Sequence, residues 1–177
     1  MAMEKNAVST IAGPIRQLFL DHGVHERFGI ALLHKHMDIA PTERLVKYRH
    51  TSVPWKVGNT NVSIVDKYEG KVLPRSFRFM DGNLVRYEFK YSREHTEHPS
   101  LQGRDVDEKF LKELRDMLAD RGFDQLLGLR DLDQRDPEMG VEVTEGKANI
   151  MMPRCIIPES ELVPALWVFG GRRGRQV

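Results

Sequence analysis

Two histidines at the end of one apolar segment are the side chains of this chain best suited to chemistry. His34 and His36 follow the apolar residues 28–33. If that segment is a β-strand, side chains two residues apart lie on one face, so both rings point the same way. An imidazole changes its charge close to neutral pH, and two of them at a cavity can therefore act as general acid and general base. Glu142, from a later alternating segment, is the carboxylate that we expect to pair with them.

Two other uses of these histidines stay open. In the first, they are hydrogen-bonded side chains at the margin of a sheet and serve only the fold. In the second, His34, His36 and Glu43 bind a divalent metal, because two histidines on one strand face and a nearby carboxylate can converge on an ion. The pattern is similar to the cupin metal motif, but six residues separate His36 from Glu43, more than in cupins, and no second cupin motif follows. The sequence therefore favours a site without a cofactor, with a divalent metal as the alternative.

Length and charge indicate one domain without a nucleic-acid partner. The chain has 177 residues, of which 40% are hydrophobic, and this is enough for a sizeable core. We expect a single domain over residues 1–177 with disordered ends at 1–10 and 170–177. Lys+Arg 27 against Asp+Glu 26 gives a net charge of +1 without a long run of one sign, so no nucleic-acid partner is expected. Assembly into a homodimer is left open.

Several signals of location and enzyme class are missing from the sequence. No apolar stretch approaches the roughly 20 residues of a membrane span, and residues 1–10 lack the apolar centre of a secretory signal. Cys155 is the only cysteine, which excludes an internal disulfide and suits a reducing compartment. We therefore expect a cytoplasmic protein with no membrane partner. The phosphate-loop, dinucleotide, nucleophile-elbow and zinc-peptidase motifs do not occur, so those enzyme classes have no support.

The best helix signal lies at residues 105–122. Asp105 and Glu108 have the spacing of a capping box, an apolar stripe follows at helical spacing, and Gly122 ends the helix. A short second helix is expected at residues 123–129, and residues 52–56, which include Pro54, are expected to form a loop or a sheet edge. With strands before and after, this order predicts an α+β fold: a mostly antiparallel sheet with one long amphipathic helix packed on it.

Aromatic residues mark a β-hairpin whose turn lies near Asp81-Gly82. A two-residue turn sets Phe77 opposite Arg86 and divides the aromatic face, whereas a three-residue loop that includes Asn83 sets Phe77 opposite Tyr87. The second register is predicted, with one aromatic and one charged face. The aromatic side chains then form either core or the apolar wall of a ligand pocket. The candidate substrate-binding residues are Phe79, Tyr87, Phe89 and Asn149.

Two parts of the chain resemble a known family. Residues 28–36 (FGIALLHKH) with 43–46 (ERLV), and residues 142–150 (EVTEGKANI), resemble a family of small uncharacterised proteins of filamentous fungi. Its members carry an apolar strand ending in His-Arg-His, then Glu-x-hydrophobic-Val, and later Glu-x-Thr-x-Gly-x-Ala-Asn-Ile. This chain departs from the pattern at Lys35, where arginine is usual, and at Val141, where cysteine is common. The resemblance implies a fungal intracellular protein but no particular activity. The matching polar positions are His34, His36, Glu43, Glu142 and Asn149.

These observations leave three hypotheses. The first is a small enzyme of fungal specialised metabolism, an isomerase, cyclase or lyase that acts on a hydrophobic small molecule by acid-base chemistry from His34 and His36. The second is a noncatalytic domain that binds a ligand or a protein, and the third is a cupin-like metal-dependent enzyme. The enzyme needs a cavity of several hundred Å³ lined by the histidines. A protein-binding module should instead expose an apolar patch.

Overall fold

Most of the chain is described by the structure, which is a computed structural model. It covers residues 7–34, 37–56, 70–93, 106–132, 140–154 and 157–170, and the backbone of residues 175–176. His36 and Cys155 lie outside these described residues. Within the described part, no helix is both long and apolar enough to cross a membrane.

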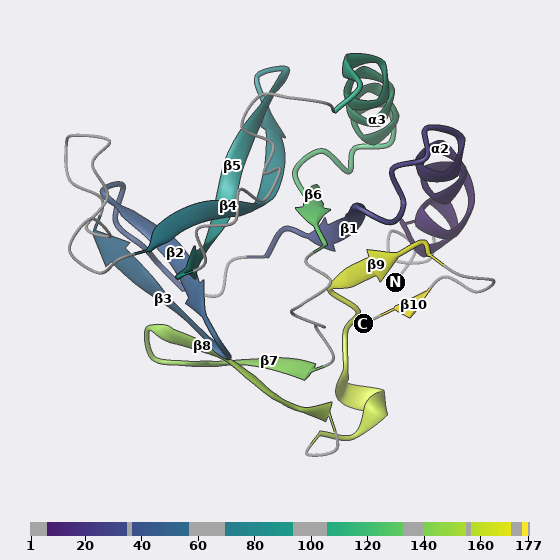
Figure 1. The fold of residues 1–177 in the computed structure, drawn as a ribbon. Helices are drawn as coiled ribbons and strands as arrows, with labels where there is room; N and C mark the ends of the chain where they lie inside the picture. Colours follow the sequence, from purple (N-terminus) through teal and green to yellow (C-terminus); the bar gives the residue numbers. More distant parts are fainter. Residues whose placement is uncertain are drawn as a thin grey trace.

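One curled sheet organises the molecule (Figure 1). In the described residues the order of its strands is β10-β9-β1-β6-β4-β5-β2-β3-β8-β7. The sheet is mixed, because β2 and β5 run parallel while the other described pairs run antiparallel. The strands are β1 Phe28–Leu32, β2 Glu43–Tyr48, β3 Thr51–Lys56, β4 Lys71–Met80, β5 Asn83–Ser92, β6 Leu127–Asp131, β7 Gly140–Glu145, β8 Ala148–Pro153, β9 Leu166–Val168 and β10 Arg175–Gln176.

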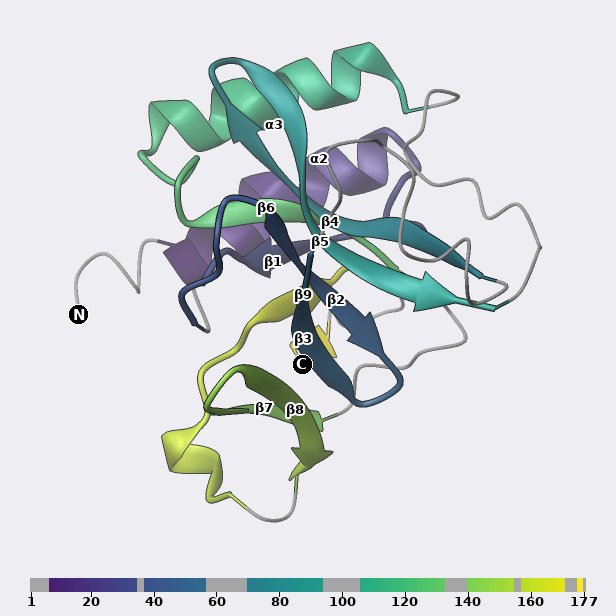
Figure 2. The same ribbon diagram turned by 90° about the vertical axis from the view of Figure 1, so that its left-hand side faces the viewer.

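The described helices gather at one end of this sheet (Figures 1 and 2). A π-helical segment, η1 (Ile11–Ile15), continues into α2 (Arg16–Asp21), and α3 (Glu108–Asp120) packs beside α2. The rings of Phe19 in α2 and Phe110 in α3 meet edge to face, with centroids 5.1 Å apart. A single 3₁₀ turn, η4 (Glu159–Glu161), lies at the opposite end of the fold.

The predicted fold class is wrong. Strands dominate the described residues, the sheet is curled and mixed, and the longest helix has only 13 residues. That helix lies with α2 over the β1, β4 and β6 end, and β2, β3, β7 and β8 extend away from both helices (Figure 2). The described residues therefore form a predominantly β structure with a small helical cap, and no long helix among them covers the sheet.

Two segments contribute to the wrong fold class. Residues 123–129 were expected to be a helix and residues 52–56 a loop or a sheet edge, but strand β6 includes part of the first segment and strand β3 includes the second. The expected second helix at residues 123–129 is instead a turn at residues 124–126 followed by the first residues of β6. Gly128 of β6 allows close packing, because a Cβ there would clash with the carbonyl oxygen of Phe77. In β3, Pro54 lies opposite Leu45 of β2, and β8 on the other side pairs only with Thr51 and Ser52. The missing N–H of Pro54 therefore interrupts no described pairing with β8.

The core lies where β1, β4 and β6 face the helices. β1 is an interior strand, paired with β6 on one side and β9 on the other, as its apolar sequence predicts. Its side chains Phe28 and Ile30 are fully buried. The same cluster includes Phe19, Phe77, Phe79, Phe110, Leu114, Leu118 and Leu129.

The register of the aromatic hairpin differs from the predicted one. Phe79 lies opposite Leu84 and Phe77 opposite Arg86, so the loop is the two-residue turn Asp81-Gly82. Both turn residues have positive φ, 51° and 78°, as a type I′ turn requires. The twist of the two strands favours this turn over the bulged loop, and it places Tyr87 away from the Phe77 position that the prediction gave it.

The ends of α3 are set by local hydrogen bonds. Its N-cap is Asp107, whose Oδ1 accepts the backbone N–H of Lys109 at 2.9 Å, so the predicted cap at Asp105 is wrong; Asp105 lies outside the described residues. At the other end Gly122 has φ +67°, and the N–H of Phe123 donates to the carbonyl of Leu118 at 2.8 Å. This is the Schellman ending expected from Gly122.

The chain termini are more regular than expected over part of their length. Residues 7–10 are helical and Thr10 and Ile11 are buried, so the disordered end expected at 1–10 is too long. At the other terminus, Arg175–Gln176 pairs with β9 as β10, where a disordered end was expected. Apolar contacts of the N-terminal helix with the core account for the first difference.

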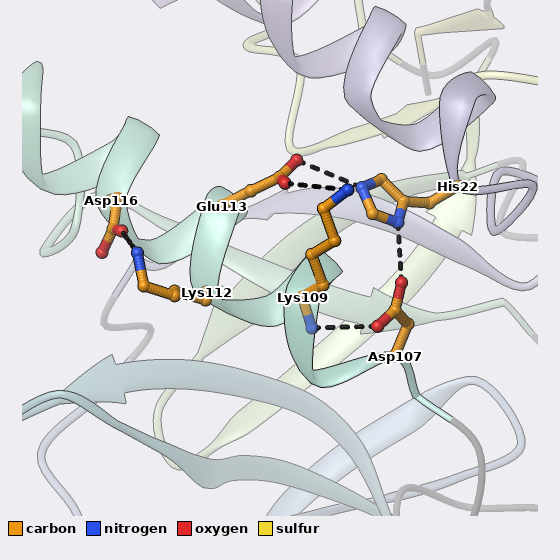
Figure 3. Close-up of polar contacts among 6 residues, drawn as sticks. All are labelled: His22, Asp107, Lys109, Lys112, Glu113 and Asp116. Carbon is orange, nitrogen blue, oxygen red and sulfur yellow. Dashed lines mark hydrogen bonds and ion pairs between the residues drawn. The ribbon is translucent and has the colours of Figure 1, made fainter.

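One histidine links helices α2 and α3 through two polar contacts, as Figure 3 shows. His22, directly after α2, lies with Nδ1 2.9 Å from Oδ2 of Asp107 and Nε2 3.1 Å from Oε2 of Glu113. Only 12% of its side chain is exposed. Lys109 also approaches Glu113, at 3.8 Å. The hydrogen bond that His22 donates to Glu113 raises the pKa of His22, burial opposes the rise, and the hydrogen bond to Asp107 adds to it.

We expect the contacts of His22 with Asp107 and Glu113 to make the free energy of unfolding depend on pH. The pKa of His22 is higher in the folded chain than its ordinary value of 6.5. The stabilisation of the fold by protonated His22 is therefore complete below pH 6.5 and is lost as the pH rises through the pKa of the folded state. Urea unfolding of the His22→Gln variant should show a smaller fall in the free energy of unfolding over this range. His50→Gln, at an exposed position, is the control and should match the native chain. An equal fall in all three proteins contradicts the role assigned to His22.

Candidate active site

His34 lies just beyond the end of β1 with both ring nitrogens engaged. Its Nδ1 is 3.1 Å from the carbonyl oxygen of Leu32, and its Nε2 is 3.5 Å from Oε2 of Glu142 on β7. A carbonyl only accepts hydrogen bonds, so the proton of the neutral ring belongs on Nδ1 and the lone pair of Nε2 faces Glu142. The curl of the sheet brings the two together, because β1 and β7 are far apart in the strand order.

The surroundings of His34 favour its protonated form. The contact with Glu142 raises its pKa above the ordinary value, burial acts in the opposite direction, and the Leu32 carbonyl and the charge of Glu88 add to the rise. The side chain keeps 38% of its surface exposed, and Glu142 keeps 26%. A proton accepted at Nε2 is thus stabilised by a carboxylate while the ring still reaches solvent or a ligand.

His34 lines two cavities of a size suited to small molecules. The first, of about 400 Å³, has a mostly apolar wall that includes Leu33, Met37, Ile39, Leu45 and Tyr87. The second, of about 580 Å³, lies between β7 and the segment before β9 and carries Glu142, Arg154, Glu159 and Glu161. A third space, of about 40 Å³, is lined by His34, Glu88, Arg130 and Glu142. It shares Glu88 with the lining of the first cavity, Glu142 with that of the second, and His34 with both.

A buried ion pair forms the floor of this region. Glu88 of β5 accepts hydrogen bonds from Arg130 of β6 and, at 3.1 Å, from the hydroxyl of Ser76 of β4. The Arg130 side chain is 6% exposed and that of Glu88 is 19% exposed. Burial acts to raise the pKa of Glu88, but the charges of Arg130 and Arg75 outweigh it and the pKa falls below its usual value. Glu88 therefore stays ionised inside the sheet.

Sequence reasoning missed this ion pair. Glu88 was expected on the charged face of the hairpin, opposite the aromatic face, and Arg130 was assigned no role. The available signal was the position of Arg130 directly after the buried apolar residues Leu127 and Leu129, where a charged side chain needs a buried partner.

The predicted substrate-binding residues are dispersed. Tyr87 lines the first cavity, and its hydroxyl donates to the carbonyl of His34 at 3.3 Å. Phe79 is buried in the core with the helices, Phe89 lies opposite Pro74 and Val46 inside the sheet, and Asn149 is buried on β8. None of these last three lines the cavities around His34.

The alternative metal site cannot be assembled from the described residues. His36 lies outside them, and the carboxylate of Glu43 accepts the N–H of Ala40 at 2.9 Å, which closes its own turn. No group of three or more histidine, cysteine or acidic side chains that could hold an ion occurs in the part of the chain that is described. His34 and Glu142 are thus the predicted catalytic residues that the fold brings into contact.

The pKa of His34 is a direct test of this contact. We expect NMR titration of the ring protons to give a pKa above 6.5 in the native protein. The Glu142→Gln substitution removes the negative charge and should lower that pKa. Glu145→Gln, on the same strand and exposed, should leave it unchanged. Equal His34 titration in all three proteins means that Glu142 does not act on the ring.

Comparison of the chain with protein-family models, with curated proteins and with solved structures finds no match.

Proposed function

We propose that this chain is a small cytoplasmic enzyme that acts on a hydrophobic small molecule by acid-base chemistry, as an isomerase, cyclase or lyase. The observation that carries the proposal is the placement of His34: its Nδ1 is held by the Leu32 carbonyl, its Nε2 faces Glu142, and its ring lines a cavity of about 400 Å³. A place in fungal specialised metabolism is part of the same proposal.

The proposed chemistry is proton transfer at a carbon next to a carbonyl group. In the proposed step the 3.5 Å contact between Nε2 of His34 and Glu142 opens. Neutral His34 then uses the lone pair of Nε2 to take the proton, the C–H bond breaks, and its electron pair moves to the carbonyl oxygen as an enolate. The imidazolium formed lies beside Glu142, which stabilises its charge. Where the substrate is a β,γ-unsaturated carbonyl compound, the enolate is a conjugated dienolate, and return of the same proton to its γ carbon gives the α,β-unsaturated isomer and restores neutral His34. His36 is not needed for this cycle.

The apolar wall supports a hydrophobic substrate. Leu33, Met37 and Leu45 face the same cavity as His34, and Tyr87 adds an aromatic surface whose hydroxyl is engaged with the His34 carbonyl. Such a wall binds through the burial of apolar surface and excludes water from the reacting carbon.

A noncatalytic ligand-binding domain is the second candidate, and the ion pair itself favours it. The Nε2 of His34 is 3.5 Å from Glu142. In this reading the protonated ring and the carboxylate form an ion pair whose role is structural, linking the end of β1 to β7. In that case substitution of His34 changes stability or ligand affinity and no proton transfer occurs.

Deuterium exchange at the α carbons of small ketones distinguishes the enzyme from the noncatalytic binding domain. We expect the protein in D₂O to exchange the α protons of 2-octanone or phenylacetone, followed by ¹H NMR, and the His34→Gln variant to lose about 10²-fold or more of the rate. Because the neutral ring is the base, the rate should fall as the pH drops through the raised pKa of His34. Glu142→Gln should move that fall to lower pH.

His50→Gln is the matched control, since His50 is an exposed histidine at the turn between β2 and β3. Its exchange rate and pH profile should equal those of the native chain. Exchange that does not depend on His34, or no exchange of either ketone, contradicts the enzymatic proposal and leaves the binding domain.

A further inference from the structure

An arginine in the first cavity has no acidic partner within the described part of the chain. Arg78 of β4 is half-buried and lines the same cavity as His34. Its guanidinium lies over the ring of Tyr87, 5.4 Å from the centroid, and its Nη2 approaches Sδ of Met80 at 3.6 Å. No carboxylate among the described residues pairs with it, and its Nε is buried without a hydrogen-bond partner there. A charged donor in this state lacks the acceptor that burial calls for.

The other arginines of this region differ from Arg78. Arg130 is paired with Glu88, and Arg115 on α3 is paired with Asp116 at 2.9 Å. Glu88 is the carboxylate in the lining of the first cavity, and it is already engaged by Arg130 and Ser76. Among the described residues that line this cavity, Arg78 therefore carries a charge that no carboxylate compensates.

We propose that the substrate of this site is a hydrophobic carboxylate whose acid group binds Arg78. The inference rests on the proposed function and specifies its substrate class. A planar carboxylate accepts two parallel hydrogen bonds from a guanidinium, which a neutral group of the same shape does not match. The stacking of Arg78 on Tyr87 holds the guanidinium in place before the ligand arrives.

The same stacking orients the ligand toward His34. Tyr87 contacts Arg78 through its ring and the backbone carbonyl of His34 through its hydroxyl, and all three residues line the same cavity. A ligand with its carboxylate at Arg78 extends its apolar part along Tyr87, Leu33 and Leu45 toward the imidazole. The second cavity carries Glu142, Glu159 and Glu161 against a single arginine, Arg154. Its acidic lining disfavours an anion and leaves the first cavity as the carboxylate site.

Binding of octanoate and of its neutral amide tests the proposal without requiring turnover. We expect NMR titration of the native protein to show octanoate binding at least about tenfold tighter than octanamide, because only the acid pairs with Arg78. Arg78→Met keeps an apolar side chain and should remove this preference, while octanamide binding stays the same. Arg78→Lys keeps the charge and should retain part of the preference.

Arg86→Met is the matched control, since Arg86 is an exposed arginine on the same hairpin and lines none of the cavities around His34. It should bind octanoate as the native chain does. Equal affinity of the native protein for acid and amide, no binding of octanoate, or equal octanoate binding by Arg78→Met and native protein overturns the proposal. If Arg78→Met does not fold, Arg78→Gln takes its place.

The outcomes separate this inference from the proposed function. If ketone exchange depends on His34 but octanoate binding does not depend on Arg78, the chemistry stands and the substrate class is wrong. If octanoate binding depends on Arg78 but no His34-dependent exchange occurs, the carboxylate site stands and the protein binds its ligand without transforming it.

Discussion

The buried ion pair between Glu88 and Arg130 is the constraint on which the rest of the site depends. The two residues lie on β5 and β6, on either side of β4, and Ser76 of β4 pairs with both positions in the sheet. The β4–β5 register shifts at Ser76, so the polar row coincides with an irregularity that re-aims side chains. Two opposite charges inside a sheet stay there only when both are satisfied. The pair thus fixes three adjacent strands in one arrangement and leaves a polar floor under His34.

The curl of the sheet completes the site above that floor. β7 is the last strand in the sheet order and β1 the third, yet Glu142 of β7 reaches His34 just after β1. Each charged group then acts on the others: Glu142 and Glu88 raise the pKa of His34, while Arg130 and Arg75 lower the pKa of Glu88. A histidine that is stabilised when protonated, but remains partly exposed in a cavity, can exchange protons with a ligand. The apolar wall and Arg78 decide which ligands are held there.

Sequence reasoning succeeded where residue type alone decides and failed where tertiary contacts decide. The apolar run at residues 28–33 indicated a strand, and β1 forms there, paired on both sides. The choice of Glu142 as the carboxylate near His34 matches the contact in the structure, although the curl that brings the two together cannot be read from the sequence. The hairpin register was wrong because the aromatic pattern was weighted above the twist that favours a two-residue turn. β6 was taken for a helix because a short apolar run has no diagnostic period, and the close contact of Gly128 with β4 is visible only in three dimensions. The roles of Glu88 and Arg130 depend on the curl, which the sequence does not reveal.

A double-mutant cycle at the buried pair tests the central claim most directly. The free energy of unfolding in urea is measured for the native chain, for Arg130→Met, for Glu88→Met and for the double variant. Removal of either partner leaves a buried charge without its counterpart, so each single variant should lose about 3 kcal/mol, and the double variant should lose much less than the sum of the two. Losses that simply add would show that Glu88 and Arg130 act independently. That result would contradict the view that their pairing sets the arrangement of the three strands beneath His34.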